Sequence, residues 1–377
     1  MSKPVIQRDE SIQHECLEKL CGIVRELSSQ GKPIEMRTWL MAYTTDVVTC
    51  YSYGDPLGLL NDHEQAVLWR EVIAALAFMT LIFRHFPLVA RIGPQIPLAF
   101  LERMSKTISL TMGLHYEARR RARLVKNDFD RPVDSKASKG GRRPTVYHEI
   151  LASNLPDEEK SVNRLSDEAF TIISTGGETT SRSLSVALYY VLATGGVLPK
   201  LRQELDKAIP DPTRVPPIKE LERLPYLTAV IRETLRIGMN VLPRSPVISP
   251  EKPLQYGEWV IPPGTSISMT YSTVMMDERV FPDPWKFDPG RFLPKNPNTE
   301  RNTRHLVVFG RGNRNCYGQN LAMSEMYLVI AGLFRRFELG LYETVFGRDI
   351  KVVRDCFLGE TSLDSKDLRV TVISERR

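Results

Sequence analysis

Apolar residues recur at helical spacing through most of the chain before residue 240. In the segment 10–26 they stand three or four positions apart, at Ile12, Cys16, Leu20 and Ile23, which predicts an amphipathic helix. The same pattern, or an apolar run between helix-breaking residues, predicts helices over 36–50, 64–86, 98–126, 165–193, 225–238 and 319–337, with another that begins near Pro199.

The pattern changes after Pro243. Short apolar pieces alternate with proline and glycine turns, including residues 262–264, and the segment 339–374 has the same texture. Such pieces are typical of short strands and loops. No internal repeat is visible, which argues against a solenoid. The sequence therefore predicts a mainly α fold with minor β.

Residues 127–145 have loop composition, with two prolines, the pair Gly140–Gly141 and no apolar period. The segment is either a linker between domains or one long surface loop. We expect a single domain over residues 1–377 with a flexible loop at about 127–145.

Composition narrows the class of protein. The chain is 42% hydrophobic and 25% charged, which is typical of globular proteins. The net charge of +6 comes partly from two basic clusters, at 119–126 and 136–143, that contain no interleaved aromatic residues. They do not indicate a nucleic-acid interface. A solvated helix end followed by a loop, or a docking face for an acidic partner, explains them.

Five scattered cysteines, odd in number and never in a C-x-x-C pair, indicate neither a disulfide framework nor a zinc cluster. They favour a reducing compartment. No stretch comes close to the roughly 18 apolar residues of a membrane-spanning helix, and the first residues do not resemble a signal peptide. The chain as written is expected to be soluble or peripheral.

The strongest chemical signal is Cys316, which precedes the helix expected at residue 319. Backbone N–H groups at a helix start stabilise a thiolate, the form of cysteine that binds metal. Gly310 and Gly318 allow close approach of a flat cofactor, and Arg314 offers a cation to an anionic group. Without its neighbours, a cysteine beside glycines would more often mark an ordinary turn.

Residues 309–318 match the pattern F-x-x-G-x-R-x-C-x-G without a gap, and this segment resembles the proximal loop of the cytochrome P450 family. The resemblance implies that Cys316 is the axial thiolate ligand of a haem b iron, with Phe309, Gly310, Gly318 and Arg314 beside the haem. It also implies that Arg244 binds a haem propionate, where an exposed loop arginine is the alternative.

Glu233 and Arg236 stand three residues apart on one face of a predicted helix, where they can pair. An exposed pair of this kind is common and contributes only about 0.2–0.5 kcal/mol. In the family that it resembles, this E-x-x-R pair is buried and structural, and Arg291 would be its third member. Gly290 departs from the family pattern, which usually has an acid there.

Residues 175–180, Thr-Gly-Gly-Glu-Thr-Thr, lie in the middle of the longest predicted helix. Two interior glycines cost about 1 kcal/mol each relative to alanine, so they indicate either close helix packing or a function. The segment resembles the oxygen-binding groove of the family, which implies that Glu178 and Thr179 deliver protons. Thr175 replaces a smaller residue and would narrow the groove.

The six histidines do not cluster, so none is expected to bind a metal, although His305 lies shortly before Phe309. Cys356 precedes a segment that resembles a substrate-contact turn of the family, and a packed core cysteine is the plainer interpretation.

The resemblance implies a fungal microsomal-type monooxygenase that hydroxylates or epoxidises a small apolar substrate. It would use O2 and electrons from an NADPH-cytochrome P450 reductase, in terpenoid or polyketide secondary metabolism. Residues 352–370 resemble the trichodiene-oxygenase-like branch. Full-length members reside at the cytosolic face of the endoplasmic reticulum membrane. A haem-thiolate isomerase or dehydratase is the rival within enzymes, and the Glu178–Thr179 pair argues against it.

The motifs match the family from the first residues to nearly the last. The membrane anchor, first helices and part of the β-domain of that family have no counterpart here, so we expect an N-terminally incomplete domain. Such a chain would expose apolar surface and hold haem weakly. A truncated, non-catalytic remnant is therefore the alternative function.

Overall fold

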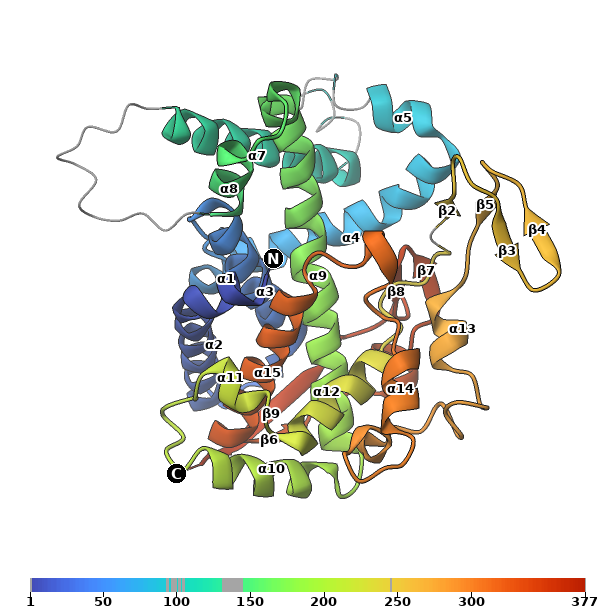
Figure 1. Cartoon of the computed structure of the whole chain (residues 1–377). Helices are drawn as coiled ribbons and strands as arrows, with labels where there is room; N and C mark the ends of the chain where they lie inside the picture. The colour runs from blue at the N-terminus through green and yellow to red at the C-terminus, as the bar shows by residue number, and fades with distance from the viewer. Residues whose placement is uncertain are drawn as a thin grey trace.

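The computed structural model describes residues 2–92, 95, 100, 103, 106–130, 145–244 and 246–376. It is mainly helical with small antiparallel sheets, as the apolar pattern predicts (Figure 1). The helices of the first half are α1 (Lys3–Arg8), α2 (Ser11–Ser29), α3 (Met36–Tyr53), α4 (His63–His85), α5 (Pro87–Ile92), α7 (Lys106–Phe129) and α8 (Val146–Ala152).

The second half contains the longest helix and the remaining ones. They are α9 (Val162–Ala193), α10 (Val197–Ala208), α11 (Ile218–Leu221), α12 (Pro225–Ile237), α13 (Tyr271–Met275), α14 (Thr299–His305) and α15 (Gln319–Arg336). Short 3-10 segments whose bounds fall within the described residues lie at Leu59–Asn61, Asp157–Lys160, Pro289–Phe292 and Gly312–Arg314, and a π-turn spans Phe346–Ile350.

The strands of the described residues are short and pair in antiparallel fashion. In the larger sheet, β9 (Arg369–Glu375) lies between β1 (Ile34–Glu35) and β6 (Phe337–Leu341). Three two-stranded ribbons complete the set: β2 (Val247–Ile248) with β5 (Ser266–Ile267), β3 (Leu254–Tyr256) with β4 (Trp259–Ile261), and β7 (Arg354–Cys356) with β8 (Leu358–Glu360).

The predicted helices are confirmed, with ends moved by a few residues. The expected loop at 127–145 is wrong at its start, because residues 127–129 continue α7 and the Lys126–Asp130 ion pair lies on that last turn. Residues 131–144 lie outside the described residues, as does most of 98–105. The segment 299–305, which has no apolar period, forms α14 and was not predicted.

Helix α9 runs through the middle of the molecule and organises its core (Figure 1). Ser161 caps its first turn by accepting a hydrogen bond from the Arg164 amide. Helices α3, α7, α12 and α15 pack around it, and the main core buries apolar residues of α2, α3, α9, α12 and α15 together.

The two glycines of α9 face α3. A Cβ on Gly176 would lie 2.8 Å from Val48 Cγ2, and one on Gly177 would lie 2.2 Å from Thr45 Oγ1. Neither distance is compatible with a side chain. Close helix packing, one of the two explanations for these glycines, is therefore sufficient.

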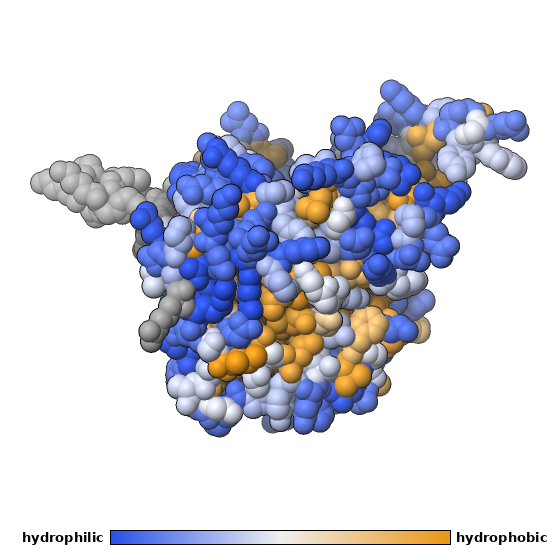
Figure 2. Space-filling model, turned by 90° about the horizontal axis from the view of Figure 1, so that it is seen from below, coloured by the Kyte–Doolittle hydropathy of each residue, from blue (hydrophilic) through white to orange (hydrophobic). Residues whose placement is uncertain are grey.

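Some apolar surface reaches solvent. Figure 2 shows apolar side chains gathered over the middle of the lower face, among polar ones. We expected no segment long and apolar enough to span a bilayer, and this expectation is wrong. Helix α4 meets both criteria, judged by its length and composition alone. Helices α9 and α10 pass the same test only as a pair that bends by 107°. Core helices of water-soluble proteins also pass it.

Candidate functional site

Cys316 lies at the end of a tight loop that leads into α15. The loop closes on itself, because the Cys316 amide donates to the Phe309 carbonyl at 2.7 Å and the Gly310 amide donates to Val307. Gly310 has φ +71° and Gly312 has φ +79°, a backbone region that other residues rarely adopt. The result is an exposed thiol held three residues before Gln319, the first residue of α15.

The surroundings of the thiol fit a flat anionic cofactor. Gly318 leaves space beside it, since even an added Cβ would lie 4.0 Å from Cys316 Sγ. Arg314 and Arg244 are exposed and form no ion pair with the residues that the structure describes. Phe309 is half-buried and packs against the main core. An iron of haem b with its propionates would suit this donor set.

Glu233 and Arg236 form a fully buried ion pair on α12. Arg236 donates twice to the carboxylate, at 2.7 and 2.8 Å, and Arg291 Nε lies 3.4 Å from the same carboxylate. Burial raises the pKa of Glu233, while Arg236 and the amide of Asp288 oppose that rise. The three predicted members therefore lie together.

Gly290 stands where the family pattern has an acid, directly before Arg291. The structure shows how the local turn is held with a glycine at this position. The Asp288 carboxylate accepts the Gly290 amide at 2.8 Å and caps the short turn Pro289–Phe292. A Cβ on Gly290 would lie 2.8 Å from that Asp288 oxygen. The turn then points Arg291 at the carbonyls of Pro282 and Asp283, as well as at Glu233.

Glu178 is held in a buried ion network. Arg37, at the start of α3, donates to Glu178 Oε1 at 2.6 Å and to Asp367 Oδ1 at 2.9 Å, and lies 3.6 Å from Glu360. Arg70 of α4 also pairs with Asp367. Although burial acts in the opposite direction, these carboxylates raise the pKa of Arg37 well above its ordinary value. Glu178 is therefore a partnered carboxylate.

Arg182 stands one turn beyond Glu178 on α9 and is also buried. Burial and the charge of Arg37 lower the pKa of Arg182 to about 10. A small cavity of about 180 Å³ borders this network and is lined by Glu178, Arg37, Glu360 and Asp367 among others. The ion network therefore borders open space on the side of this cavity.

Thr179 is half-buried and does not bond to Glu178. Its hydroxyl donates to the Thr175 carbonyl at 3.0 Å within α9, while its carbonyl accepts from Asn240 at 3.1 Å. The amide of Gly359 in turn donates to the Asn240 carbonyl. The structure thus ties Thr179 to the loop after α12 and, through Asn240, to strand β8, but the two predicted proton-delivery residues have separate partners.

Sequence reasoning missed a third acid. Glu325 on α15 is 1% exposed, hydrogen-bonds to Thr180 of α9, and has no hydrogen-bond partner for Oε1 among the described residues. Burial raises its pKa well above the ordinary value. The available signal was that Glu325 is the sole charged residue between Asn315 and Phe334.

Two other candidates have structural roles. His305 Nδ1 lies 2.7 Å from the Arg301 carbonyl of its own helix. Cys356 is buried, in agreement with a packed cysteine. No group of three or more metal-ligating side chains occurs within the described ranges. Cys316 is therefore the candidate ligand that the structure leaves accessible.

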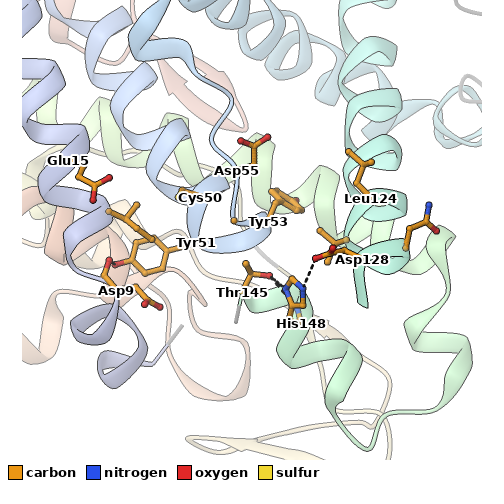
Figure 3. Close-up of a pocket in the computed structure, with 14 residues that line it drawn as sticks. Asp9, Glu15, Cys50, Tyr51, Tyr53, Asp55, Leu124, Asp128, Thr145 and His148 are labelled. Carbon is orange, nitrogen blue, oxygen red and sulfur yellow. Dashed lines mark hydrogen bonds and ion pairs between the residues drawn. The ribbon is translucent and has the colours of Figure 1, made fainter. Parts of the chain in front are cut away.

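A cavity of about 760 Å³ lies away from this site between α2, α3, α7 and α8 (Figure 3). Figure 3 shows His148 bonded to Thr145 and directed at Asp128, with the separations 2.7 and 3.7 Å. Four carboxylates, Asp9, Glu15, Asp55 and Asp128, line it. None of the predicted site residues lines this cavity, so the size of a cavity does not by itself identify the candidate catalytic site.

The fold and site define a mainly helical protein with an exposed cysteine just before a long helix. A family model described as Cytochrome P450 matches residues 1–351. The chain belongs to the cytochrome P450 family.

Curated relatives agree over nearly the whole chain. The cytochrome P450 monooxygenase sdnE of Sordaria araneosa is 36% identical across 98% of this chain and 73% of its own length. The cytochrome P450 monooxygenase MO6277 of Ascocoryne sarcoides is 33% identical, with 94% and 70% covered. The tryptophan 6-hydroxylase fscE of Fusarium equiseti is 33% identical, with 91% and 66% covered. The enzyme class of this chain is that of the cytochrome P450 monooxygenases.

Proposed function

We propose that this chain is a haem-thiolate monooxygenase that inserts oxygen into a small apolar substrate of fungal secondary metabolism. The observation that carries the proposal is the exposed Cys316 thiol, held by the Phe309–Cys316 backbone bond at the start of α15. The relatives support the setting, since they are fungal cytochrome P450 monooxygenases. Electrons would come from an NADPH-dependent reductase. The reductase would dock on the basic segment 119–126 of this chain.

Bound haem would supply the oxygen-activating chemistry, because a thiolate ligand favours O–O cleavage. The residues of the chain would hold and orient it. Cys316 would ligate the iron, and Arg314 and Arg244 would meet the propionates with charge-assisted hydrogen bonds. Glu233, Arg236 and Arg291 would act as scaffold, because all three are buried and their charged groups lie against one another.

Proton supply would fall to residues of α9. The Thr179 hydroxyl would hold a water, and Glu178 would exchange protons with solvent from the side of the 180 Å³ cavity when its bond to Arg37 opens. We assign the two side chains different roles because Thr179 and Glu178 have different hydrogen-bond partners.

The test is the difference spectrum of the reduced, carbon-monoxide-bound protein. A Soret band at the thiolate-ligated position is expected for the unaltered chain, and Cys316→Ala should abolish it. Cys356→Ala removes a buried thiol elsewhere in the chain and should leave the band in place. A band that survives Cys316→Ala would refute the ligand assignment, and an unaltered protein with no haem spectrum would favour the non-catalytic remnant.

A further inference from the structure

Asn240, in the loop after α12, is bound to the central helix by its side chain. Its amide nitrogen donates to the Thr179 carbonyl at 3.1 Å and also bonds to the Ser183 hydroxyl. Asn240 is 6% exposed, so both bonds form away from solvent. In the reverse orientation the amide oxygen would face the Thr179 carbonyl, and two acceptors do not bond. The nitrogen is therefore the donor and Thr179 the acceptor.

The Thr179 carbonyl accepts more than its helix requires. Besides Asn240, the Ser183 hydroxyl donates to it at 3.0 Å. A side chain that bonds into the hydrogen-bond ladder of a helix bends the helix at that place. The Thr179 hydroxyl donates to the Thr175 carbonyl at 3.0 Å, one turn earlier. The direction of this hydroxyl therefore follows the backbone that Asn240 holds.

The backbone of Asn240 is fixed by a different element, strand β8. The Gly359 amide donates to the Asn240 carbonyl at 3.0 Å, and Val241 pairs with Leu358 in an antiparallel bridge. Asn240 thus joins two elements that are far apart in the sequence. Its main chain belongs with β8 and its side chain with α9.

The contact between β8 and this loop is close. Met239, directly before Asn240, has φ +44°, a region that residues other than glycine rarely adopt. A Cβ on Gly359 would lie 2.5 Å from the Met239 carbonyl oxygen. Strained backbone of this kind persists only where the surrounding structure holds it, and it is concentrated at functional sites. Packing against β8 therefore sets the position of Asn240.

We propose that Asn240 is a positioning residue, which sets the place of Thr179 according to the position of β8. Asn240 carries no proton or electron in this role, and no covalent bond changes. The inference rests on the proposed function, in which the Thr179 hydroxyl holds a water, and it names the residue that orients this hydroxyl. Glu178, whose carboxylate pairs with Arg37, lies outside the link.

The first measurement is the carbonyl signal of Thr179 in nuclear magnetic resonance. In protein labelled with carbon-13 and nitrogen-15 at threonine alone, amide–carbonyl correlations arise where two threonines are adjacent, at 44–45 and 179–180. Thr45→Ser removes the first correlation and so assigns both. Spectra are taken in the reduced, carbon-monoxide-bound form, because ferric haem would broaden the signals, and a haem-free chain gives the same correlations.

Asn240→Leu keeps the size of the side chain and removes its donor. A carbonyl carbon moves upfield when it loses a hydrogen bond, so the Thr179 signal should move upfield while that of Thr44 stays in place. Gly359→Ala should move the Thr179 signal as well, because the new Cβ would push β8 away from Met239. This measurement needs neither haem nor turnover.

The second measurement is product formed per NADPH consumed with a reductase and indole, a small apolar probe. Misplacing a reacting group by about 1 Å can cost roughly 100-fold, so Asn240→Leu should lower this yield by about tenfold or more with the thiolate-type spectrum intact. Asn240→Gln retains an amide and should recover part of the yield.

Asn302→Leu is the matched control for the loss of a buried amide. Asn302 is 4% exposed and donates to the Arg291 carbonyl at 2.8 Å, and its Oδ1, like that of Asn240, has no hydrogen-bond partner among the described residues. The control should leave both the Thr179 signal and the yield per haem unchanged. An equal loss of yield in the two leucine variants would overturn the positioning role.

The outcomes separate the two proposals. A Thr179 signal unmoved by Asn240→Leu, or an unchanged yield, would overturn the role of Asn240, and a signal that Gly359→Ala leaves in place would overturn the link to β8. An unaltered protein without a thiolate-type spectrum would instead refute the monooxygenase proposal. The carbonyl signals decide the role of Asn240 where indole is not hydroxylated. If Asn240→Leu does not fold, Asn240→Gln and Gly359→Ala test the same link.

Discussion

Replacing Gly177 with alanine tests how closely α9 and α3 are packed. The new Cβ would lie 2.2 Å from Thr45 Oγ1 and 3.5 Å from Thr45 Cα. Carbon atoms in favourable contact stand about 3.5–4.0 Å apart, so the atoms must separate by roughly 1 Å or more. Thr45 is β-branched and buried, and rotating it places a methyl group near the same position. The two helices must therefore move.

Two effects of opposite sign set the magnitude. Overpacking a well-filled core costs about 1–3 kcal/mol, whereas alanine is about 1 kcal/mol better than glycine inside a helix. Gly177→Ala should therefore lower the free energy of unfolding by about 0–2 kcal/mol. Gly22, inside α2, has no atom within 4 Å of an added Cβ. Gly22→Ala should raise the free energy of unfolding by about 1 kcal/mol.

The assay is urea unfolding followed by circular dichroism, with the two alanine variants compared directly. Their difference, about 1–3 kcal/mol, isolates the packing cost from helix propensity. The double variant Thr45→Ala/Gly177→Ala removes the clashing oxygen and should recover most of the loss. If Gly177→Ala stabilises the protein as much as Gly22→Ala does, the close contact between α9 and α3 is refuted.

Two further predictions concern buried charges. Arg236→Met leaves Glu233 without its main partner in the core, which should cost about 3–5 kcal/mol in urea unfolding; a loss under about 1 kcal/mol would contradict the buried pair. Burial opposes ionisation of Asp349, yet Arg348 and the amides of Val345 and Lys366 lower its pKa to about 2. Because the folded-state pKa lies below the unfolded one, Asp349 should add about 2 kcal/mol at pH 7 that disappears as pH falls from about 5 towards 2. Asp349→Asn should remove this pH dependence, and an unchanged profile would contradict it.

Local pattern was enough to predict most helices. The apolar periods of α2 and α9 and the Pro225 start of α12 are properties of neighbouring residues, so the sequence contains them. Helix α14 was missed because its segment is polar throughout. Its stability comes from tertiary contacts: Asn302 donates to the Arg291 carbonyl, and Arg301 donates to Val280.

The site was predictable where a motif is contiguous and unpredictable where partners are distant. Glu233 and Arg236 stand one turn apart, so their pairing could be expected. The pairing of Glu178 with Arg37 joins residues 141 positions apart, and nothing local indicates it. For the same reason the partner of Glu325 on another helix could not be predicted, although its isolation in an apolar segment was visible.

The long-range pairing of the chain has a consequence for biosynthesis. Arg37 and Asp367 stand 330 residues apart, and β9, which joins β1 to β6, begins two residues after Asp367. At about 5–20 residues per second, a ribosome needs roughly 15–65 s to add the missing partner. Throughout that interval β1 has an open edge, and β6 has one from its own synthesis until β9 is added; open edges can pair with other chains. Slower translation lengthens this vulnerable period, so the yield of folded protein should depend on the elongation speed between β1 and β9.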